Sequence, residues 1–224
     1  MSFFNKFIPS AMIALSITSC NTPEKQNEDF NYNVDRFADI EVLRYKVPEF
    51  DSLSVKQKAL VYYLTEAAIT GRDILWDQNG KYNLRIRQTL EEIYKNFNGD
   101  KTSAEFKAFE KYLKQIWFAN GIHHHYSNDK FRPEFPREWF EPLVGKYAKE
   151  RLTIDEKLLC DIIFDETLYA SRLNQTDGVD MVKESACNYY EGVTMAEVDK
   201  FYADMIDEND PRPISYGLNS KLVK

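Results

Sequence analysis

The chain has 224 residues, of which 43% are hydrophobic and 14% aromatic, and its formal net charge is −7. This apolar content can fill a sizeable core, which excludes disorder for most of the chain. Acidic and basic residues are interspersed, so no basic face offers the counterion release that nucleic-acid binding needs, and nucleic acid is excluded as a partner.

The first 20 residues (MSFFNKFIPSAMIALSITSC) are predicted to be a lipoprotein signal peptide. Their apolar run, from Phe7 to Ile17, is too short to span a bilayer. The last four residues are an aliphatic residue, two small residues and Cys20, which resembles a bacterial lipobox. This resemblance implies acylation of Cys20 and an exported protein of the cell envelope, anchored to a membrane on its periplasmic or outer side. A secretory signal with a coincidental cysteine is the alternative.

Residues 21–29 (NTPEKQNED) are polar and lack apolar periodicity, so we expect a flexible tether there. Folded structure is expected from Phe30, and no composition shift divides residues 30–224 into two domains. In an exported protein Cys160 and Cys187 could form a disulfide. However, Cys160 lies in the apolar run LLCDIIF, which favours a buried thiol.

Start signals and apolar periodicity predict a helical body. A helical region begins with a possible capping box at Ser54 and Gln57 and ends at Asn79-Gly80. Its apolar positions recur at helical spacing and are Leu60, Leu64, Ala67 and Ala68. A second helix has one apolar stripe and stops at Asn98-Gly99. The stripe consists of Ile86, Leu90, Ile93, Tyr94 and Phe97.

Four more helices are predicted from similar signals. Their start signals are Thr102 with Glu105, Pro136, Thr153 with Glu156, and Thr194 with Glu197. Three of them have an apolar face, formed by Phe106, Phe109, Leu113, Ile116 and Trp117 in the first, by Phe140, Leu143, Val144 and Tyr147 in the second, and by Val198, Phe201, Tyr202, Met205 and Ile206 in the last. Residues 173–191 are expected to be a loop with a short helix.

A strand is predicted after the prolines of the segment 210–213. Apolar and polar residues alternate there, with Ile214, Tyr216, Leu218, Ser220 and Leu222 on one face. The other extended candidate, residues 41–47, is equally compatible with a helix. We therefore expect a mainly α fold with a few β-strands (α+β), a C-terminal strand that lacks a ladder partner within the chain, and a chain that is the front part of a longer protein.

The residues that could carry chemistry do not form a recognisable catalytic set. His123, His124 and His125 are adjacent and point in divergent directions, whereas a helical zinc site needs histidines about four residues apart. The sequence contains no HExxH, HxxE, CxxC or GxSxG motif. From spacing alone, we expect the three imidazoles to line a loop.

Residues 117–133 (WFANGIHHHYSNDKFRP) resemble the cleft loop of the dipeptidyl peptidase III family. Four other segments, in the same order along the chain, are similar to the bacterial branch of this family. They are residues 71–91 (GRDILWDQNGKYNLRIRQTLE), 106–118 (FKAFEKYLKQIWF), 188–194 (NYYEGVT) and 211–222 (PRPISYGLNSKL). The likeness extends over roughly residues 30–224.

This resemblance implies a two-lobed zinc exopeptidase that releases dipeptides from the N-terminus of short peptides. The peptide would lie as an added strand between a lobe that contains a β-barrel and a helical zinc lobe. The chain would form the helical part of the barrel-containing lobe. The family's HExxGH zinc motif matches no position here, so this chain alone is expected to bind no catalytic zinc, to be inactive, and to need the remaining C-terminal part of the enzyme.

The resemblance also indicates which residues touch the peptide. Tyr126 stands where relatives place an aromatic side chain against the substrate, and His125 and Ser127 flank it. Asn120 and Gly121 are expected to shape the turn that leads to them. In the alternative, Tyr126 only packs the loop onto its own lobe. The alternative for the whole chain is a stand-alone, lipid-anchored module that binds peptides without catalysis.

Overall fold

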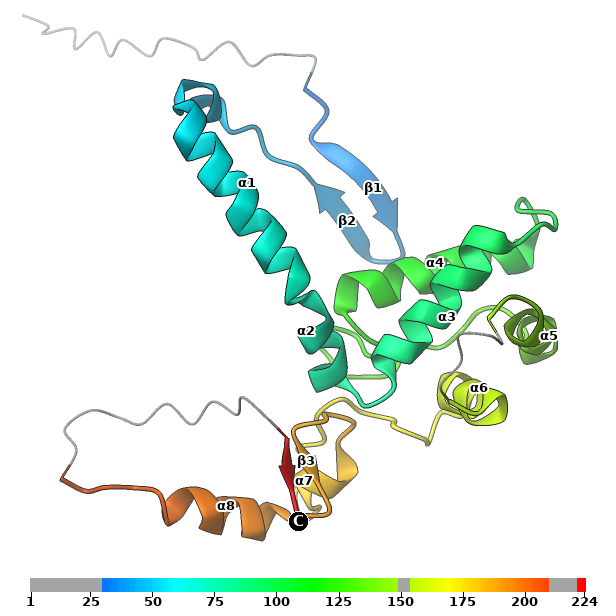
Figure 1. Cartoon of the computed structure of the whole chain (residues 1–224). Coiled ribbons are helices and arrows are strands. Elements are labelled where there is room, and N and C mark those ends of the chain that lie inside the picture. The colour runs from blue at the N-terminus through cyan, green and yellow to red at the C-terminus, as the bar shows by residue number, and fades with distance from the viewer. Residues whose placement is uncertain (1–29, 149–153, 210–220) are drawn as a thin grey trace, which may run out of the picture.

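The computed structural model describes residues 30–148, 154–209 and 221–224 (Figure 1). It is mainly helical, with 51% helix and 9% strand, as the sequence predicts. The predicted signal peptide with Cys20, the tether, Thr153 and most of the predicted C-terminal strand lie outside the described residues. Among the described helices, none is both long and apolar enough to cross a membrane.

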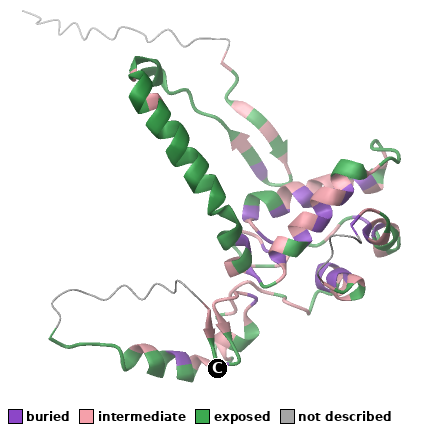
Figure 2. Ribbon diagram, in the orientation of Figure 1, coloured by how far each residue is buried: buried purple, intermediate pink, exposed green. Residues whose placement is uncertain are grey.

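Four helices enclose the core. They are α3 (Asn83–Asn96), α4 (Ala104–Ala119), α5 (Arg137–Tyr147) and α6 (Glu156–Phe164), and the buried residues of Figure 2 concentrate on them. The predicted apolar stripes supply about half of the buried residues of this core, namely Ile86, Leu90, Ile93, Phe106, Phe109, Leu113, Ile116, Phe140 and Val144. Each such side chain stabilises the fold by about 1.5–3 kcal/mol through burial. Trp117 is an exception, because 39% of its surface is exposed.

The predicted capping boxes at Ser54 and at Thr194 are both present. The predicted cap of α4 at Thr102 is wrong by one residue. The hydroxyl oxygen of Ser103 accepts a hydrogen bond from the Phe106 amide at 3.2 Å, whereas the Thr102 hydroxyl donates to Asp100 at 2.6 Å. At the start of α6 the carboxylate of Asp155 accepts from the Leu158 amide at 3.0 Å.

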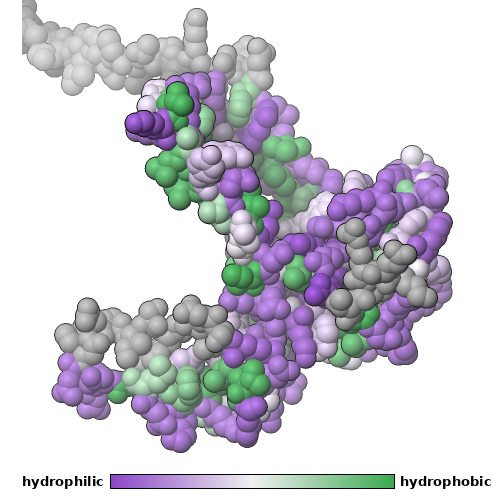
Figure 3. Space-filling view, viewed as in Figure 1, coloured by the Kyte–Doolittle hydropathy of each residue, from purple (hydrophilic) through white to green (hydrophobic). Residues whose placement is uncertain are grey.

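The first predicted helical region consists of two helices, α1 (Val55–Thr70) and α2 (Arg72–Asn79), which meet at Gly71. None of the residues of α1 is buried, and Leu60 and Leu64 are 58% and 60% exposed. Apolar residues lie on all sides of α1, and its end packs on α2, while its length extends away from the core (Figures 1 and 3). Within the described residues, α1 therefore adds little to the core.

Two short strands precede α1. β1 (Asn33–Phe37) and β2 (Ile40–Leu43) pair as an antiparallel hairpin, with Ala38 at a φ of 48° in the turn. The structure thus selects a strand for the start of the segment 41–47. A 2.7 Å ion pair between Lys114 and Asp35 fastens the hairpin to α4. The pairing continues one step before β1, where the Arg44 amide donates to the Tyr32 carbonyl at 2.9 Å, and the hairpin is followed by the 3-10 helix η1 (Pro48–Ser52).

The C-terminal part of the described chain has small elements. They are α7 (Met181–Glu184), which is the predicted short helix, β3 (Tyr190–Glu191), α8 (Met195–Ala203) and β4 (Leu222–Val223). The prediction of an unpaired C-terminal strand is wrong for its described end. β4 pairs in parallel with β3, and the Leu222 amide donates to the Tyr189 carbonyl at 3.0 Å. This partner was missed because β3 is only two residues long.

The predicted inward face of α8 is only partly buried. Val198 is 3% exposed, whereas Phe201 is 43% exposed within the helix, and Met205 and Ile206, which lie beyond its end at Ala203, are 49% and 57% exposed. The two described cysteines are free thiols, and Cys160 is buried, as predicted. Burial raises the pKa of Cys160 to about 11, so this thiol stays protonated and unreactive.

The assignment of Ser103 as the cap of α4 predicts different stability losses for substitutions at Ser103 and at Thr102. Replacing Ser103 by Ala removes the acceptor of the Phe106 amide and is expected to lower the free energy of unfolding by about 1 kcal/mol. Thr102→Ala removes only a contact to the exposed Asp100 and should change it by less than about 0.5 kcal/mol. Denaturant unfolding of both variants measures the two changes, and a larger loss for Thr102→Ala would contradict the assignment of the cap.

Candidate functional site

The predicted peptide-binding residues lie on one loop, residues 120–133, which we call the cleft loop. It begins at Asn120, which ends α4 in the left-handed conformation with φ 54°. The side-chain amide of Asn79 donates to the Asn120 carbonyl at 3.1 Å, and the Gly121 amide donates to the Ile116 carbonyl at 3.3 Å. The start of the cleft loop is therefore held by both α2 and α4.

A buried amide fits between two glycines at this point. Asn83 is 2% exposed, and its side-chain oxygen accepts a hydrogen bond from the Ile122 amide at 3.3 Å. A Cβ atom added at Gly80 or at Gly121 would collide with the Asn83 amide. Glycine is thus needed at both positions because the Asn83 side chain occupies the space that any other residue would fill.

Backbone hydrogen bonds fix the rest of the cleft loop. The His124 amide donates to the Asp129 carbonyl at 2.7 Å, and the Phe131 amide donates to the Ile122 carbonyl at 2.8 Å, so the two arms of the loop pair with one another. The second arm, residues 128–133, which we call the outer arm, pairs with the segment that contains Arg172. The Arg172 amide donates to the Asn128 carbonyl at 2.9 Å. The Arg172 guanidinium also donates twice to the Asn128 side-chain oxygen, at 2.9 and 2.8 Å.

Two of the three imidazoles have structural partners. His123 is 3% exposed and its Nε2 donates to the Tyr169 carbonyl at 2.7 Å. Nδ1 of His124 accepts from the amides of Tyr126 and Ser127, both at 3.2 Å, so its Nε2 carries the proton and donates to Asp39 at 3.3 Å. These hydrogen bonds hold the backbone of the cleft loop in its conformation.

The described residues offer no cluster of metal ligands. Within residues 30–148, 154–209 and 221–224, no group of three His, Cys, Asp or Glu side chains is placed to hold a metal ion. The nitrogens of His123 and His124 that have partners bind backbone groups and Asp39 instead. No step of a reaction is therefore assigned to a metal held by these residues.

The tip of the cleft loop presents aromatic surface. The ring of Tyr126 lies 4.4 Å from that of His125, which in turn lies 5.0 Å from Phe118 at the end of α4. Tyr126 is 84% exposed, so among the described residues it is not buried against its own lobe. The Ser127 hydroxyl accepts from the Asp129 amide at 3.2 Å, and Ser127 is exposed.

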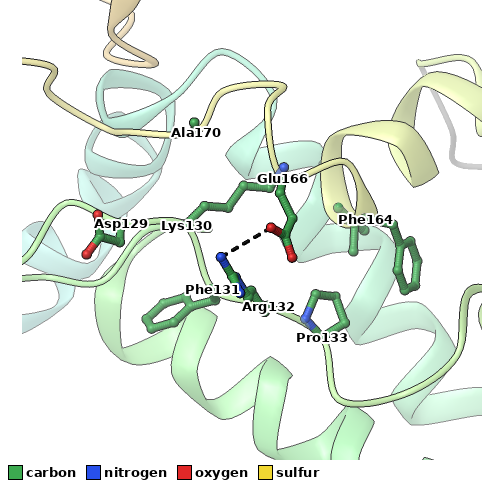
Figure 4. A pocket seen from close by; sticks show the side chains of 9 residues that line it. Asp129, Lys130, Phe131, Arg132, Pro133, Phe164, Glu166 and Ala170 are labelled. Atoms are coloured by element: carbon green, nitrogen blue, oxygen red, sulfur yellow. Dashed lines mark ion pairs between the residues drawn. The ribbon is translucent and has the colours of Figure 1, made fainter.

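A hollow of about 520 Å³ lies against the outer arm of the cleft loop (Figure 4). It has an apolar part, which includes Phe131, Pro133 and Phe164, and an ion pair in which Arg132 and Glu166 are 3.2 Å apart. Lys130 also lines it, and its ammonium donates to the carbonyls of Asp165 and Leu168 at 2.5 and 2.8 Å. Burial lowers the pKa of Lys130 to about 8.

The structure places the five predicted binding residues on one loop and adds neighbours that the sequence did not indicate. Asn120, Gly121, His125, Tyr126 and Ser127 do lie together on one loop. Asn83, Lys130, Arg132 and Glu166 were missed. The dipeptide Asn-Gly occurs at 79–80, 98–99 and 120–121, and only the structure shows that the first and third copies meet at the Asn83 side chain.

No family model matches the chain, and no curated protein matches it at a significant level.

Burial of His123 makes the fold sensitive to acid. Burial lowers the pKa of His123 from 6.5 to about 4, so between these values the unfolded chain binds a proton that the folded chain does not. The free energy of unfolding is therefore expected to fall by about 2 kcal/mol between pH 7 and pH 5 from this residue alone. Urea unfolding at both pH values tests this, and His123→Gln should remove most of the fall. An equal fall in the variant would contradict it.

The contact between Asn83 and Gly121 predicts that one methyl group added at residue 121 lowers the stability of the fold. Gly121→Ala drives Cβ into the Asn83 amide and is expected to destabilise the protein by about 1–3 kcal/mol. Gly71→Ala is the matched control, because the nearest atom to an added Cβ there is 3.8 Å away. Thermal unfolding of the two variants measures the difference. Equal melting temperatures would mean that the close approach does not constrain the loop.

Proposed function

We propose that this chain forms a wall of the peptide-binding cleft of a dipeptidyl peptidase III-like zinc exopeptidase, in which the catalytic zinc is held elsewhere in the complete enzyme. The enzyme would release dipeptides from the N-terminus of short peptides. The likeness of five segments in order along the chain supports this family. The proposed location is the cell envelope, where acylated Cys20 would anchor the protein to a membrane.

One observation carries the proposed role of the cleft loop. Tyr126 is 84% exposed on a loop whose base and both arms are held by hydrogen bonds. Tyr126 is part of an aromatic group, because its ring lies beside that of His125, which in turn contacts Phe118, and tyrosine is among the residues that most often dominate binding energies. A peptide lying against Tyr126 and His125 would bury this surface without reorganising the loop.

The second candidate is a stand-alone peptide-binding module anchored through Cys20. The pairing of β4 with β3 favours it, because this strand then has a ladder partner within the described residues. The two candidates share the role of Tyr126 and differ in catalysis. Release of dipeptides from a pentapeptide by the complete protein, abolished by a zinc chelator and restored by zinc, supports the enzyme. Peptide binding without any release supports the module.

Replacing Tyr126 by Ala tests the shared role. In the complete protein we expect Tyr126→Ala to weaken the binding of short peptides about tenfold, which corresponds to about 1.4 kcal/mol, because the exposed ring is lost as a contact. Tyr126→Phe should retain most of the affinity. Isothermal titration with a pentapeptide that carries a reduced, uncleavable second peptide bond gives the affinities.

Tyr45→Ala is the control, because Tyr45 is 79% exposed and follows β2 at the open end of the hairpin, whereas the hairpin contacts His124 of the cleft loop through Asp39 in its turn. It should bind the peptide as the unmodified protein does. If Tyr126→Ala and Tyr45→Ala bind with the same affinity as the unmodified protein, the cleft loop is not the peptide-binding surface.

A further inference from the structure

The hollow against the outer arm of the cleft loop combines an apolar part with a charged rim. Phe131 and Ile163 are 8% and 1% exposed, so the protein side of the hollow is formed by core residues. Its volume of about 520 Å³ lies in the range of sites that bind small ligands. An apolar side chain of a ligand could be buried here.

The ion pair at the rim can separate at a small cost in free energy. Arg132 and Glu166 are 3.2 Å apart and their side chains are 76% and 63% exposed. Exposed pairs of this kind contribute between about 0 and 1 kcal/mol, because water solvates both partners when they separate. The two side chains point toward one another in Figure 4, while the carboxylate of Asp129 lies at the edge of the view, away from the pair. Glu166 can therefore be replaced on Arg132 by another carboxylate.

Lys130 adds a positive charge that is held in place. Its ammonium donates to two backbone carbonyls, those of Asp165 and Leu168, so it supports the segment that carries Glu166. The carboxylates of Asp165 and Glu166 also act on Lys130, so the cation that remains for a ligand at the rim is Arg132 once Glu166 leaves it. The guanidinium of Arg132 supplies the paired N–H donors that bind a carboxylate in two places at once.

We propose that this hollow binds the C-terminal residue of a short peptide, with the free carboxylate on Arg132 and an apolar side chain against Phe131 and Pro133. This inference rests on the proposed function and specifies which peptides the site accepts. Tyr126 and Arg132 are six positions apart on the same loop, so their Cα atoms are at most about 20 Å apart. A peptide that touches both in an extended form has about six residues or fewer.

The proposal makes opposite predictions for the two members of the ion pair. The probe is the pentapeptide Ala-Ala-Ala-Ala-Leu with a reduced second peptide bond, prepared both as the free acid and as the C-terminal amide. In the complete protein we expect the acid to bind at least tenfold more tightly than the amide. Arg132→Gln should abolish this preference, and Glu166→Gln should strengthen binding of the acid several-fold without changing binding of the amide.

A second ion pair supplies the controls. Arg36 and Glu41 are 2.9 Å apart with side chains 70% and 42% exposed, and they lie on the β1–β2 hairpin. Arg36→Gln and Glu41→Gln should leave the preference for the acid unchanged. If acid and amide bind equally to the unmodified protein, or if Arg132→Gln retains the preference, this inference is wrong while the proposed function stands. If neither peptide binds, the proposed function itself fails.

Discussion

The side-chain amide of Asn83 is the constraint on which the candidate site depends. It lies between Gly80 and Gly121. Its oxygen accepts a hydrogen bond from the backbone amide of Ile122, the residue that follows Gly121 in the cleft loop. The turn that ends α2 and the turn that ends α4 therefore share one buried group. Substitution at either glycine would push them apart, and the direction in which the cleft loop leaves α4 would change with them.

Further hydrogen bonds hold the rest of the cleft loop beyond Ile122. His123 and His124 use their nitrogens to hold backbone groups, and the loop's two arms and the segment that contains Arg172 pair through backbone hydrogen bonds. A loop fixed in this way loses little conformational freedom when a ligand binds, so more of the contact energy appears as affinity. The same order places Tyr126 at the tip and Arg132 on the outer arm, where a short peptide could contact both.

The long helix α1 differs from this compact region. Its apolar residues lie on all sides and are exposed, whereas a helix that is apolar all round is usually buried in a larger core. An exposed apolar surface of this kind commonly marks a place where another polypeptide surface packs. α1 therefore agrees with the proposal of a larger enzyme without identifying what covers it.

Local signals predicted the helices well, because caps and 3.6-residue periodicity are properties of adjacent residues. Two capping boxes and the buried stripes of α3, α4 and α5 were predicted in this way. Failures came where distant residues decide the outcome. Whether Leu60 and Leu64 are buried depends on what packs against α1, and β3 exists only because β4 pairs with it.

The candidate site likewise contains residues that are adjacent in sequence and residues that only the fold brings together. Tyr126 and its neighbours are contiguous in sequence, so the resemblance of one segment was enough to predict them as a group. Asn83 and Glu166 join the site from α3 and from the segment after α6, and nothing in their local sequence indicates it. The dipeptide Asn-Gly marks both turns, but it also occurs at 98–99, so it does not identify the contact between them.

Hydrogen exchange measured for each amide of the complete protein, with and without an uncleavable short peptide, tests the central claim most directly. The claim is that the cleft loop is ordered before the peptide binds and that the peptide then covers it. The account predicts slow exchange at His124, Asn128 and Phe131 in the free protein, and additional protection confined to the cleft loop and the segment after α6 when the peptide is present. Fast exchange of these three amides in the free protein, or peptide-induced protection only elsewhere, would contradict it.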